Sequence, residues 1–163
     1  MNFLKADGVC IYLMEEDGKL YLRYCQGVSE DVCPKGSYAG ENSAIQRVAD
    51  TNVFMIYEDL PENCPDEIRI LEGEKLNSLA YIPISSKVRG AFGVIRIGSK
   101  KRQHFTRKLK NVLELIGNRI GVAIENATLQ NQCIKSEEKY RTLFNSDPHP
   151  IFILDTLTFN ILD

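Results

Sequence analysis

The sequence predicts an α+β fold: a central antiparallel sheet with short helices on one face and a long C-terminal helix on the other. Two pairs of apolar, strand-like runs lie within residues 8–25 and 78–98, and each pair is joined by a polar turn. Between the pairs the apolar residues have helical spacing, and this spacing returns from residue 106 to about residue 145. Hairpins grouped apart from helices are typical of α+β domains.

Length and composition bound the class of protein. The chain has 163 residues, which fits one domain of roughly 150 residues with a short remainder. A hydrophobic fraction of 44% is typical of a globular protein, and a net charge of −2 provides no strong field for nucleic acid or an anionic membrane. No apolar run approaches the roughly 20 residues of a membrane span, and the N-terminus lacks a secretory signal. We therefore expect a cytoplasmic protein.

The first hairpin is predicted from two runs rich in β-branched and aromatic residues, 8–14 and 19–25, on either side of Asp17-Gly18. Asp-Gly favours a two-residue turn, because both central residues of such a turn need positive φ. Paired positions then sum to 35, which places Tyr12 opposite Arg23. A longer loop remains open and would shift this register.

The middle of the chain is predicted to alternate short helices and strands. The nearly continuous apolar runs of the last two strands indicate a sheet that is covered on both faces. Asn42 or Ser43 is the expected cap of the first helix. The elements are expected at residues 41–50 (helix), 53–57 (strand), 66–76 (helix), 78–85 (strand) and 90–98 (strand).

The long helix is expected to begin after Thr106, whose hydroxyl can cap its first turn, and to carry two apolar stripes. A helix with two apolar faces has two packing partners, here the sheet and another helix from this chain or a second subunit. We assign to a parallel homodimer the stripe Leu109, Leu113, Ile116, Ile120, Ala123, Ala127 and Ile134. The second stripe consists of Val112, Leu115, Val122, Leu129 and Cys133.

The sequence resembles a GAF domain from Ala6 to about Asn131. The segments that carry the resemblance are ADGVCIYL at 6–13, GENSAI at 40–45, NSLAYIPI at 77–84, RGAFGVI at 89–95 and, in the helix after Phe105-Thr106, IGVAIENA at 120–127. The resemblance implies a sensory fold over residues 1–131, in which a sheet lies between a helical bundle and a ligand pocket.

The tail is similar to the opening of a PAS domain. Asp147-Pro148 is expected to stop the long helix, and residues 151–154 and 159–162 predict two short strands, too few for a core. The similarity covers SEEKYRTLFNSDPHPIFILD at 136–155. It implies a signalling linker helix at 132–146 and the truncated start of a PAS domain at 147–163, within a longer signalling chain.

Motifs that carry catalysis are absent from the sequence. There is no glycine-rich phosphate loop, no GxSxG and no HExxH. The two histidines, His104 and His149, are expected to be exposed loop and turn residues, and five cysteines without a CxxC pair do not predict a metal site. We therefore expect a domain that is not an enzyme. A sulfoxide reductase that uses cysteines is the alternative if the domain is an enzyme.

The resemblance implies a ligand pocket between the sheet and the segments 33–45, 57–72 and 78–83. Apolar walls with a few polar groups are what a small-molecule site needs. The polar candidates are Ser37, Tyr38, Asn42, Ser43, Tyr57, Glu58, Ser78 and Tyr81. The apolar candidates are Ile45, Phe54, Ile68, Leu71 and Phe92. Each of these is otherwise a core residue or a solvated loop residue.

Cofactor hypotheses centre on the cysteines. The family's cyclic-nucleotide pattern is not present, and no cysteine is followed by histidine, so covalent bilin attachment is not expected. Cys33 and Cys64 each precede proline, a setting for haem-thiolate ligation or redox sensing. In the predicted register Cys10 faces Cys25 within disulfide reach, which gives a second redox hypothesis. The alternative is a turn residue or a small buried apolar residue.

Together these features predict a non-catalytic sensory module that binds a small molecule or senses redox state. The long helix would relay the signal to a downstream output domain, such as that of a sensor histidine kinase. The alternatives are a structural dimerisation spacer without a ligand and part of a diguanylate cyclase regulator. Neither a nucleic-acid partner nor a membrane span is expected.

Overall fold

The computed structural model describes residues 6–28, 37–58, 76–102, 105–146, 153–154 and 161–162. The chain forms two compact units, Met1–Ile124 and Glu125–Asp163. Residues 66–75 of the helix predicted at 66–76 lie outside the described residues, as do Cys33, Cys64, Ile68, Leu71, His104 and His149.

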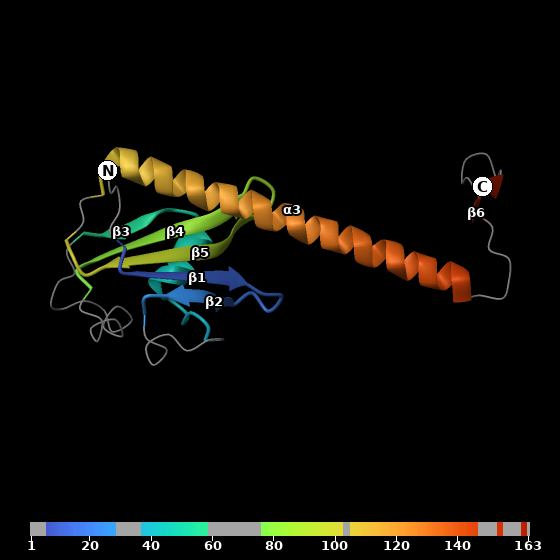
Figure 1. Ribbon diagram of the computed structural model, residues 1–163, viewed down its shortest axis with the longest axis horizontal. Helices are drawn as coiled ribbons and strands as arrows, with labels where there is room; N and C mark the ends of the chain where they lie inside the picture. Colours follow the sequence, from blue (N-terminus) through green and yellow to red (C-terminus); the bar gives the residue numbers. More distant parts are fainter. Residues whose placement is uncertain are drawn as a thin grey trace. The chain divides into compact units, whose positions relative to one another are not determined.

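A five-stranded antiparallel sheet forms the centre of the first unit (Figure 1). Its strand order is β2-β1-β5-β4-β3, so the two hairpins pair with each other through β1 and β5. The strands are β1 (Gly8–Met14), β2 (Leu20–Gln26), β3 (Met55–Tyr57), β4 (Ser78–Ser86) and β5 (Gly90–Ser99). Their ends lie within two residues of the predicted positions, and the antiparallel α+β fold is confirmed.

The loop of the β1–β2 hairpin is longer than the two-residue turn that Asp-Gly favours. Glu15 N–H donates to the carbonyl of Lys19 at 3.0 Å, which leaves three residues in the loop, and Gly18 adopts a φ of 77°. The extra residue shifts the register by one. Tyr12 therefore pairs with Leu22, and the predicted pairing of Tyr12 with Arg23 is wrong.

A β-bulge then reverses this shift farther along the hairpin. Arg23 has no partner on β1 and forms an ion pair with Glu15 instead. A bulge places two residues of one strand opposite one residue of the other, so the register changes by one beyond it. As a result Cys10 pairs with Cys25, as predicted. The prediction included neither the three-residue loop nor the bulge at Arg23, whose shifts in register cancel each other.

Helix α1 (Ala44–Thr51) covers one face of the sheet. Of the two predicted caps, Ser43 performs this role, because its Oγ accepts a hydrogen bond from the N–H of Gln46 at 3.1 Å. Asn42 instead adopts a φ of 70° just before the helix. The core on this face is formed by Ala44, Ile45, Val48 and Ala49 of α1 with Cys10, Tyr12, Leu20, Leu22, Leu79, Tyr81 and Val94 of the sheet.

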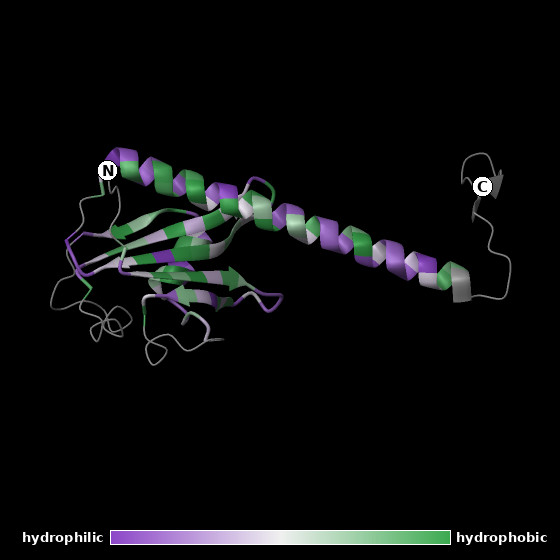
Figure 2. Cartoon of the chain, in the orientation of Figure 1, coloured by the Kyte–Doolittle hydropathy of each residue, from purple (hydrophilic) through white to green (hydrophobic). Residues whose placement is uncertain are grey.

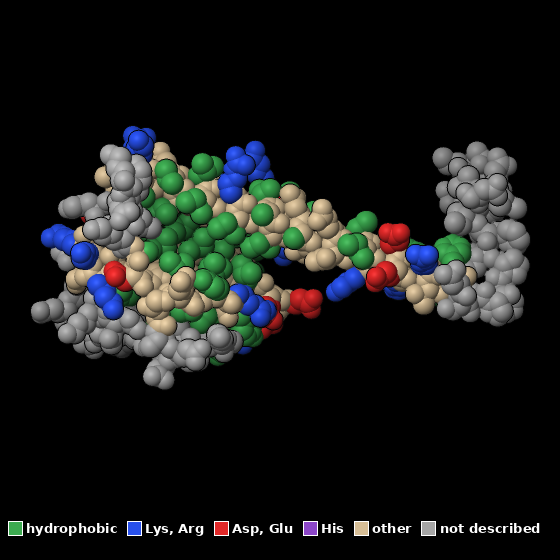
Figure 3. All heavy atoms as spheres, in the orientation of Figure 1, with side chains coloured by type: hydrophobic (Ala, Val, Ile, Leu, Met, Phe, Trp, Pro, Cys, Tyr) green, Lys and Arg blue, Asp and Glu red, His purple; other side chains and the backbone are tan. Residues whose placement is uncertain are grey.

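Helix α3 (Arg107–Ser146) packs its residues up to Ile124 against the opposite face. Thr106 caps the helix, since its Oγ1 accepts a hydrogen bond from the N–H of Leu109 at 3.3 Å. Figure 3 shows apolar side chains gathered where α3 lies over the sheet. The buried core here consists of Ala80, Ile82, Ile84, Phe92, Ile95, Ile97, Phe105 and Leu113.

Two glycines bring α3 close to β4. A Cβ built on Gly117 would collide with the carbonyl oxygen of Pro83, and one built on Gly121 would collide with the carbonyl oxygen of Ser85. Ser85 Oγ also donates to Asn118 Oδ1 of α3 at 2.9 Å. The helix therefore contacts the backbone of the strand directly over this turn.

The packing of α3 differs from the predicted assignment of its stripes. Leu113 is only 4% exposed, and Leu109 and Ile120 also pack against the sheet, so this part of the stripe assigned to a dimer is already covered. These side chains face the sheet because Gly117 and Gly121 lie on the same side of the helix. The second stripe, including Val112, Leu115 and Val122, is exposed.

The second unit contains the rest of α3 and one short strand pair. Along Glu125–Phe144 most side chains are exposed, among them Leu129, Ile134, Tyr140 and Leu143. Figure 2 shows apolar and polar residues alternating along this helix. Strand β6 (Ile153–Leu154) pairs with β7 (Ile161–Leu162) in antiparallel fashion, within the two predicted strand segments. Among the described residues, no helix combines the length and apolar character needed to cross a membrane.

Candidate functional site on the α1 face of the sheet

One row of paired residues crosses all five strands on the face that carries α1. Cys25 pairs with Cys10, Cys10 with Arg96, Arg96 with Tyr81, and Tyr81 with Met55. Such cross-strand neighbours have Cβ atoms about 4.5–5.5 Å apart. Two thiols, a guanidinium, a phenol and a thioether are thus brought side by side by the register of the sheet.

Arg96 places a positive charge inside this row. The residue is only 8% exposed, and its Nη2 donates to Cys10 Sγ at 3.1 Å. Its guanidinium carbon also lies 5.9 Å from the centre of the Tyr12 ring, within the range of a cation–π contact. A buried charge is retained only where polar or π-electron partners compensate for lost hydration, and these contacts supply part of that compensation.

The start of β4, outside this row, is held by polar contacts within the protein. Ser78 Oγ donates to the carbonyls of Glu58 and Lys101, at 2.9 and 3.3 Å. The carboxylate of Glu58 accepts a hydrogen bond from the N–H of Phe105 at 3.0 Å. Ser78 and Glu58, both predicted as ligand-orienting residues, therefore join the start of β4 to the segment that leads into α3.

Aromatic residues line the β3 edge of the same face. The rings of Tyr57 and Tyr81 meet edge to face, with centres 6.2 Å apart. The Tyr57 hydroxyl lies 3.3 Å from the sulfur of Met55. Both tyrosines were predicted pocket residues, and the sheet brings them together.

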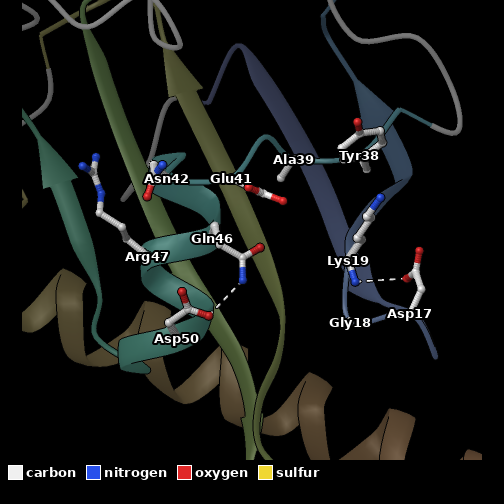
Figure 4. Close-up of a pocket in the computed structure, with 10 residues that line it drawn as sticks. All are labelled: Asp17, Gly18, Lys19, Tyr38, Ala39, Glu41, Asn42, Gln46, Arg47 and Asp50. Atoms are coloured by element: carbon white, nitrogen blue, oxygen red, sulfur yellow. Dashed lines mark hydrogen bonds between the residues drawn. The ribbon is translucent and has the colours of Figure 1, made fainter.

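An open cavity of about 400 Å³ lies between α1 and the turn of the β1–β2 hairpin (Figure 4). Glu41 and Gln46 point toward the hairpin in this view, whereas Arg47 points away from it. The lining residues are Asp17, Gly18, Lys19, Tyr38, Ala39, Glu41, Asn42, Gln46, Arg47 and Asp50. Because they include three carboxylates and two cations, the cavity suits a small polar ligand rather than an apolar one.

The charged groups of the cavity are fixed by local contacts. Lys19 Nζ lies 4.7 Å from the centre of the Tyr38 ring. The carboxylate of Asp17 accepts hydrogen bonds from the backbone N–H of Lys19 at 3.0 Å and from the hydroxyl of Tyr21 at 2.8 Å. Both hydrogen bonds lower the pKa of Asp17 from its usual 3.8, and the bond from the Lys19 backbone has the larger effect. The bond between Tyr21 and Asp17 also raises the pKa of Tyr21.

Besides Ser78, Glu58 and the two tyrosines described above, the predicted pocket residues within the described ranges divide into three groups. Tyr38 and Asn42 line the cavity, and Ser37 lies beside β2, where its carbonyl accepts from the N–H of Leu22 at 2.9 Å. Ser43 serves as a cap, and Ile45 belongs to the core under α1. Phe54 and Phe92 pack on the opposite face with α3, so they cannot belong to a site with the others. That prediction is wrong, because continuous apolar strands do not reveal which residues face which side.

Sequence reasoning missed the most distinctive residue of this face. Arg96 is the single charged residue within the apolar strand β5, and an isolated charge in a strand buried on both sides is a signal that could have identified it. It also missed Lys19, Glu41 and Gln46 of the cavity, which read as solvated residues of a turn and a helix. Within the described ranges, no group of three or more side chains is arranged to hold a metal ion.

Solved structures similar to this chain include a domain of a sensor histidine kinase and an enzyme. The GAF domain of a two-component sensor histidine kinase from Bacillus halodurans is 23% identical, with a TM-score of 0.67 over 79% of this chain and 88% of that chain. The second GAF domain of DevS from Mycobacterium smegmatis is 16% identical, with a TM-score of 0.61 over 78% and 86%. A type II free methionine-R-sulfoxide reductase from Thermoplasma acidophilum is 20% identical, with a TM-score of 0.61 over 75% and 80%.

The family comparison agrees with this fold. The curated proteins that were compared include no match to the chain. A family model described as the GAF domain matches residues 1–125, which contain the whole sheet, α1 and the part of α3 that packs on the sheet. The chain belongs to the GAF domain family.

Proposed function

We propose that this chain is a non-catalytic sensory module that binds a small polar molecule on the α1 face and relays the event through α3. GAF domains of sensor proteins are regulatory modules, and a similar domain belongs to a sensor histidine kinase. The observation that carries the proposal is the asymmetry of the sheet. One face is closed by apolar contacts with α3, while the other combines an open, charged cavity with a buried guanidinium.

The chemistry of the cavity narrows the class of ligand. Lys19 and Glu41 offer opposite charges on its two walls, and Gln46, whose amide nitrogen donates to Asp50, offers an amide oxygen on the α1 side. A zwitterion the size of an amino acid would satisfy both charges, whereas an apolar ligand would leave them without compensation. A similar fold in an enzyme named for free methionine sulfoxide makes that compound a suitable first probe.

Thermal unfolding of the 163-residue chain tests ligand binding. The probes are free methionine sulfoxide, a cyclic nucleotide and haemin, each added over a concentration series. A ligand at 100 times its Kd stabilises the folded state by about 2.7 kcal/mol. Lys19→Ala should abolish the shift in Tm, and Lys87→Ala is the matched control because Lys87 is exposed in the β4–β5 turn. If no probe shifts Tm, the structural spacer without a ligand is favoured.

The relay requires a second helix, and we propose a parallel homodimer through the exposed stripe of α3. Val112, Leu115, Val122, Leu129 and Cys133 recur at alternating heptad positions and are exposed. Arg119 and Asn126 occupy the same heptad position as Val112 and Cys133. A polar asparagine at this position specifies register in coiled coils, which supports two helices over a nonspecific apolar contact.

Cys133 provides a direct test of this arrangement. In a parallel, in-register pair each Cys133 faces its own copy, so mild oxidation should produce a disulfide-linked dimer on a non-reducing gel. Cys133→Ser should remove that band, while Cys33→Ser and Cys64→Ser should not. A chain that sediments as a monomer at high concentration and forms no Cys133-linked dimer would contradict the proposal.

The wider setting of the domain is also proposed. We assign residues 1–131 to the sensory domain, 132–146 to a linker helix and 147–163 to the start of a PAS-like domain, in a cytoplasmic signalling protein. The β6–β7 pair is consistent with strands at the start of such a domain. The output domain would be a histidine kinase, with a diguanylate cyclase as the alternative. Expression of a longer chain with assays for autophosphorylation and for diguanylate cyclase activity separates the two.

A further inference from the structure

Cys10 and Cys25 form a close pair of thiols at the end of the cross-strand row. Their sulfur atoms lie 2.9 Å apart, and their backbones are directly paired between β1 and β2. A disulfide requires about 2.05 Å between sulfurs and Cα atoms about 4.4–6.8 Å apart, a range that includes antiparallel neighbours. The two sulfurs need to approach by less than about 1 Å, which rotation of the side chains can provide.

Arg96 distinguishes this pair from two ordinary buried cysteines. Its Nη2 donates to Cys10 Sγ at 3.1 Å from the neighbouring strand. A guanidinium beside a sulfur stabilises the thiolate, which is the nucleophilic form of cysteine. Because Arg96 is itself buried, solvent screens this interaction weakly.

The two thiols differ in their access to solvent. Cys10 is 0% exposed, whereas Cys25 is only partly buried, on the strand at the edge of the sheet. A small oxidant in solution therefore reaches Cys25 first, while Cys10 is held beside it as the second nucleophile. An accessible thiol beside a second thiol that can attack its sulfenic acid is the arrangement of a reversible redox pair.

We propose that Cys10 and Cys25 are a redox-active dithiol, which a peroxide oxidises to an intramolecular disulfide with the help of Arg96. The Cys25 thiol releases its proton, and the thiolate attacks one oxygen of hydrogen peroxide. The O–O bond breaks, Cys25 becomes a sulfenic acid, and the departing hydroxide takes up the released proton and leaves as one water. The thiolate of Cys10 then attacks Cys25 Sγ, the S–O bond breaks, and the departing hydroxide takes up a proton to form the second water. Two thiols lose two electrons, and one peroxide is reduced to two waters.

Closing the disulfide changes the surroundings of Arg96. Its thiolate partner becomes a neutral sulfur, so the guanidinium loses a charged acceptor in the core beneath α1. The inference thereby deepens the sensory function proposed above and rests on it for its biological meaning. The covalent step itself requires neither a bound ligand nor a dimer.

The test uses the 163-residue chain with Cys33, Cys64 and Cys133 replaced by serine, so that only the pair remains. After hydrogen peroxide treatment we expect the intact mass to decrease by two hydrogens, both cysteines to resist alkylation after denaturation, and a thiol reductant to reverse both changes. With Cys10→Ser the reaction should stop at one added oxygen on Cys25. Circular dichroism confirms that each variant is folded.

Arg96 is tested as a positioning and activating residue by the rate of closure. Arg96→Gln should slow disulfide formation about tenfold, equivalent to about 1.4 kcal/mol in the barrier, because it removes the charge that stabilises the attacking Cys10 thiolate. Arg96→Lys retains the charge and should restore much of the rate. Equal rates for the parent and Arg96→Gln would exclude the role of Arg96. Thiols that remain open to alkylation, or oxidise only to separate sulfinic acids, would overturn the pair itself.

The outcomes separate this inference from the proposed function. Closure without any change in the ligand-induced shift in Tm or in the sedimentation of the dimer would leave the redox pair standing and count against its role in sensing. A normal ligand response in a chain that never closes the disulfide would count against the redox pair alone.

Discussion

The two faces of the sheet differ in the chemistry of what they bury. The α3 face is built from aliphatic and aromatic side chains and from two glycines that admit the helix. The α1 face mixes apolar residues with two thiols, a buried guanidinium and several phenols. The difference teaches that one sheet can support two tasks. One face packs closely and tolerates few substitutions, and the other face holds groups that can react or bind a ligand.

The largest expected effect is the loss of a buried side chain on the α3 face. Leu113→Ala should reduce the free energy of unfolding by about 3 kcal/mol, because it removes a side chain that is 4% exposed and leaves a cavity. Glu114→Ala is the control on the same helix: Glu114 is exposed and lies outside both apolar stripes, so we expect less than about 0.5 kcal/mol. Urea unfolding measures both. Equal losses would show that α3 packs through a different side.

The close approach of α3 to β4 gives the next largest effect. Gly121→Ala gains about 1 kcal/mol of helix propensity but forces a methyl group onto the carbonyl of Ser85, so we expect a net loss of about 2 kcal/mol. Gly40→Ala is the matched control, since no atom lies within 4 Å of its added Cβ. A Gly121→Ala protein as stable as the parent would contradict direct backbone contact.

On the α1 face, the cap of α1 offers a smaller effect. Ser43→Ala removes the acceptor for the N–H of Gln46 and should cost about 1 kcal/mol. Ser43→Asn keeps a capping oxygen and should retain most of that stability. If Ser43→Asn is as destabilising as Ser43→Ala, burial of Ser43 rather than capping determines its contribution.

The smallest effect concerns the charge of the hairpin turn. Because the pKa of Asp17 is lowered in the folded state, its contribution to stability is present above its unfolded value of 3.8 and is lost as pH falls through the lower folded value. Asp17→Asn should therefore make the free energy of unfolding fall slightly less steeply as pH decreases below about 4. Glu16→Gln is the control, because it removes a charge from the same turn. NMR titration of the carboxyl groups measures the pKa of Asp17 directly.

The fold was predictable because its signals are local. Ser43 and Thr106 are recognisable caps, and the alternation of hairpins and helices sets the architecture. The register between β1 and β2 was less accessible, because a three-residue loop and the bulge at Arg23 shift it in opposite directions. Neither leaves a distinct pattern in the sequence.

The site was predicted only in part, for a different reason. Tyr38 and Asn42 were named because the resemblance placed the segment 33–45 at the pocket, and both line the cavity, but Phe54 and Phe92 were assigned to the wrong face. The significance of Arg96 depends on its register with Cys10 and Tyr81, three segments that lie far apart in the sequence. Long-range pairing of this kind is specified by the whole sheet rather than by any one segment.

The glycines of α3 have a mechanical consequence. Where side chains separate a helix from a sheet, a displacement of one layer can be absorbed by changes of rotamer in the other. At Gly117 and Gly121 no side chain intervenes, and the backbone of α3 lies against the carbonyls of Pro83 and Ser85. A movement of β4 at this point must therefore be followed by the helix, which makes this contact a rigid joint between the two layers.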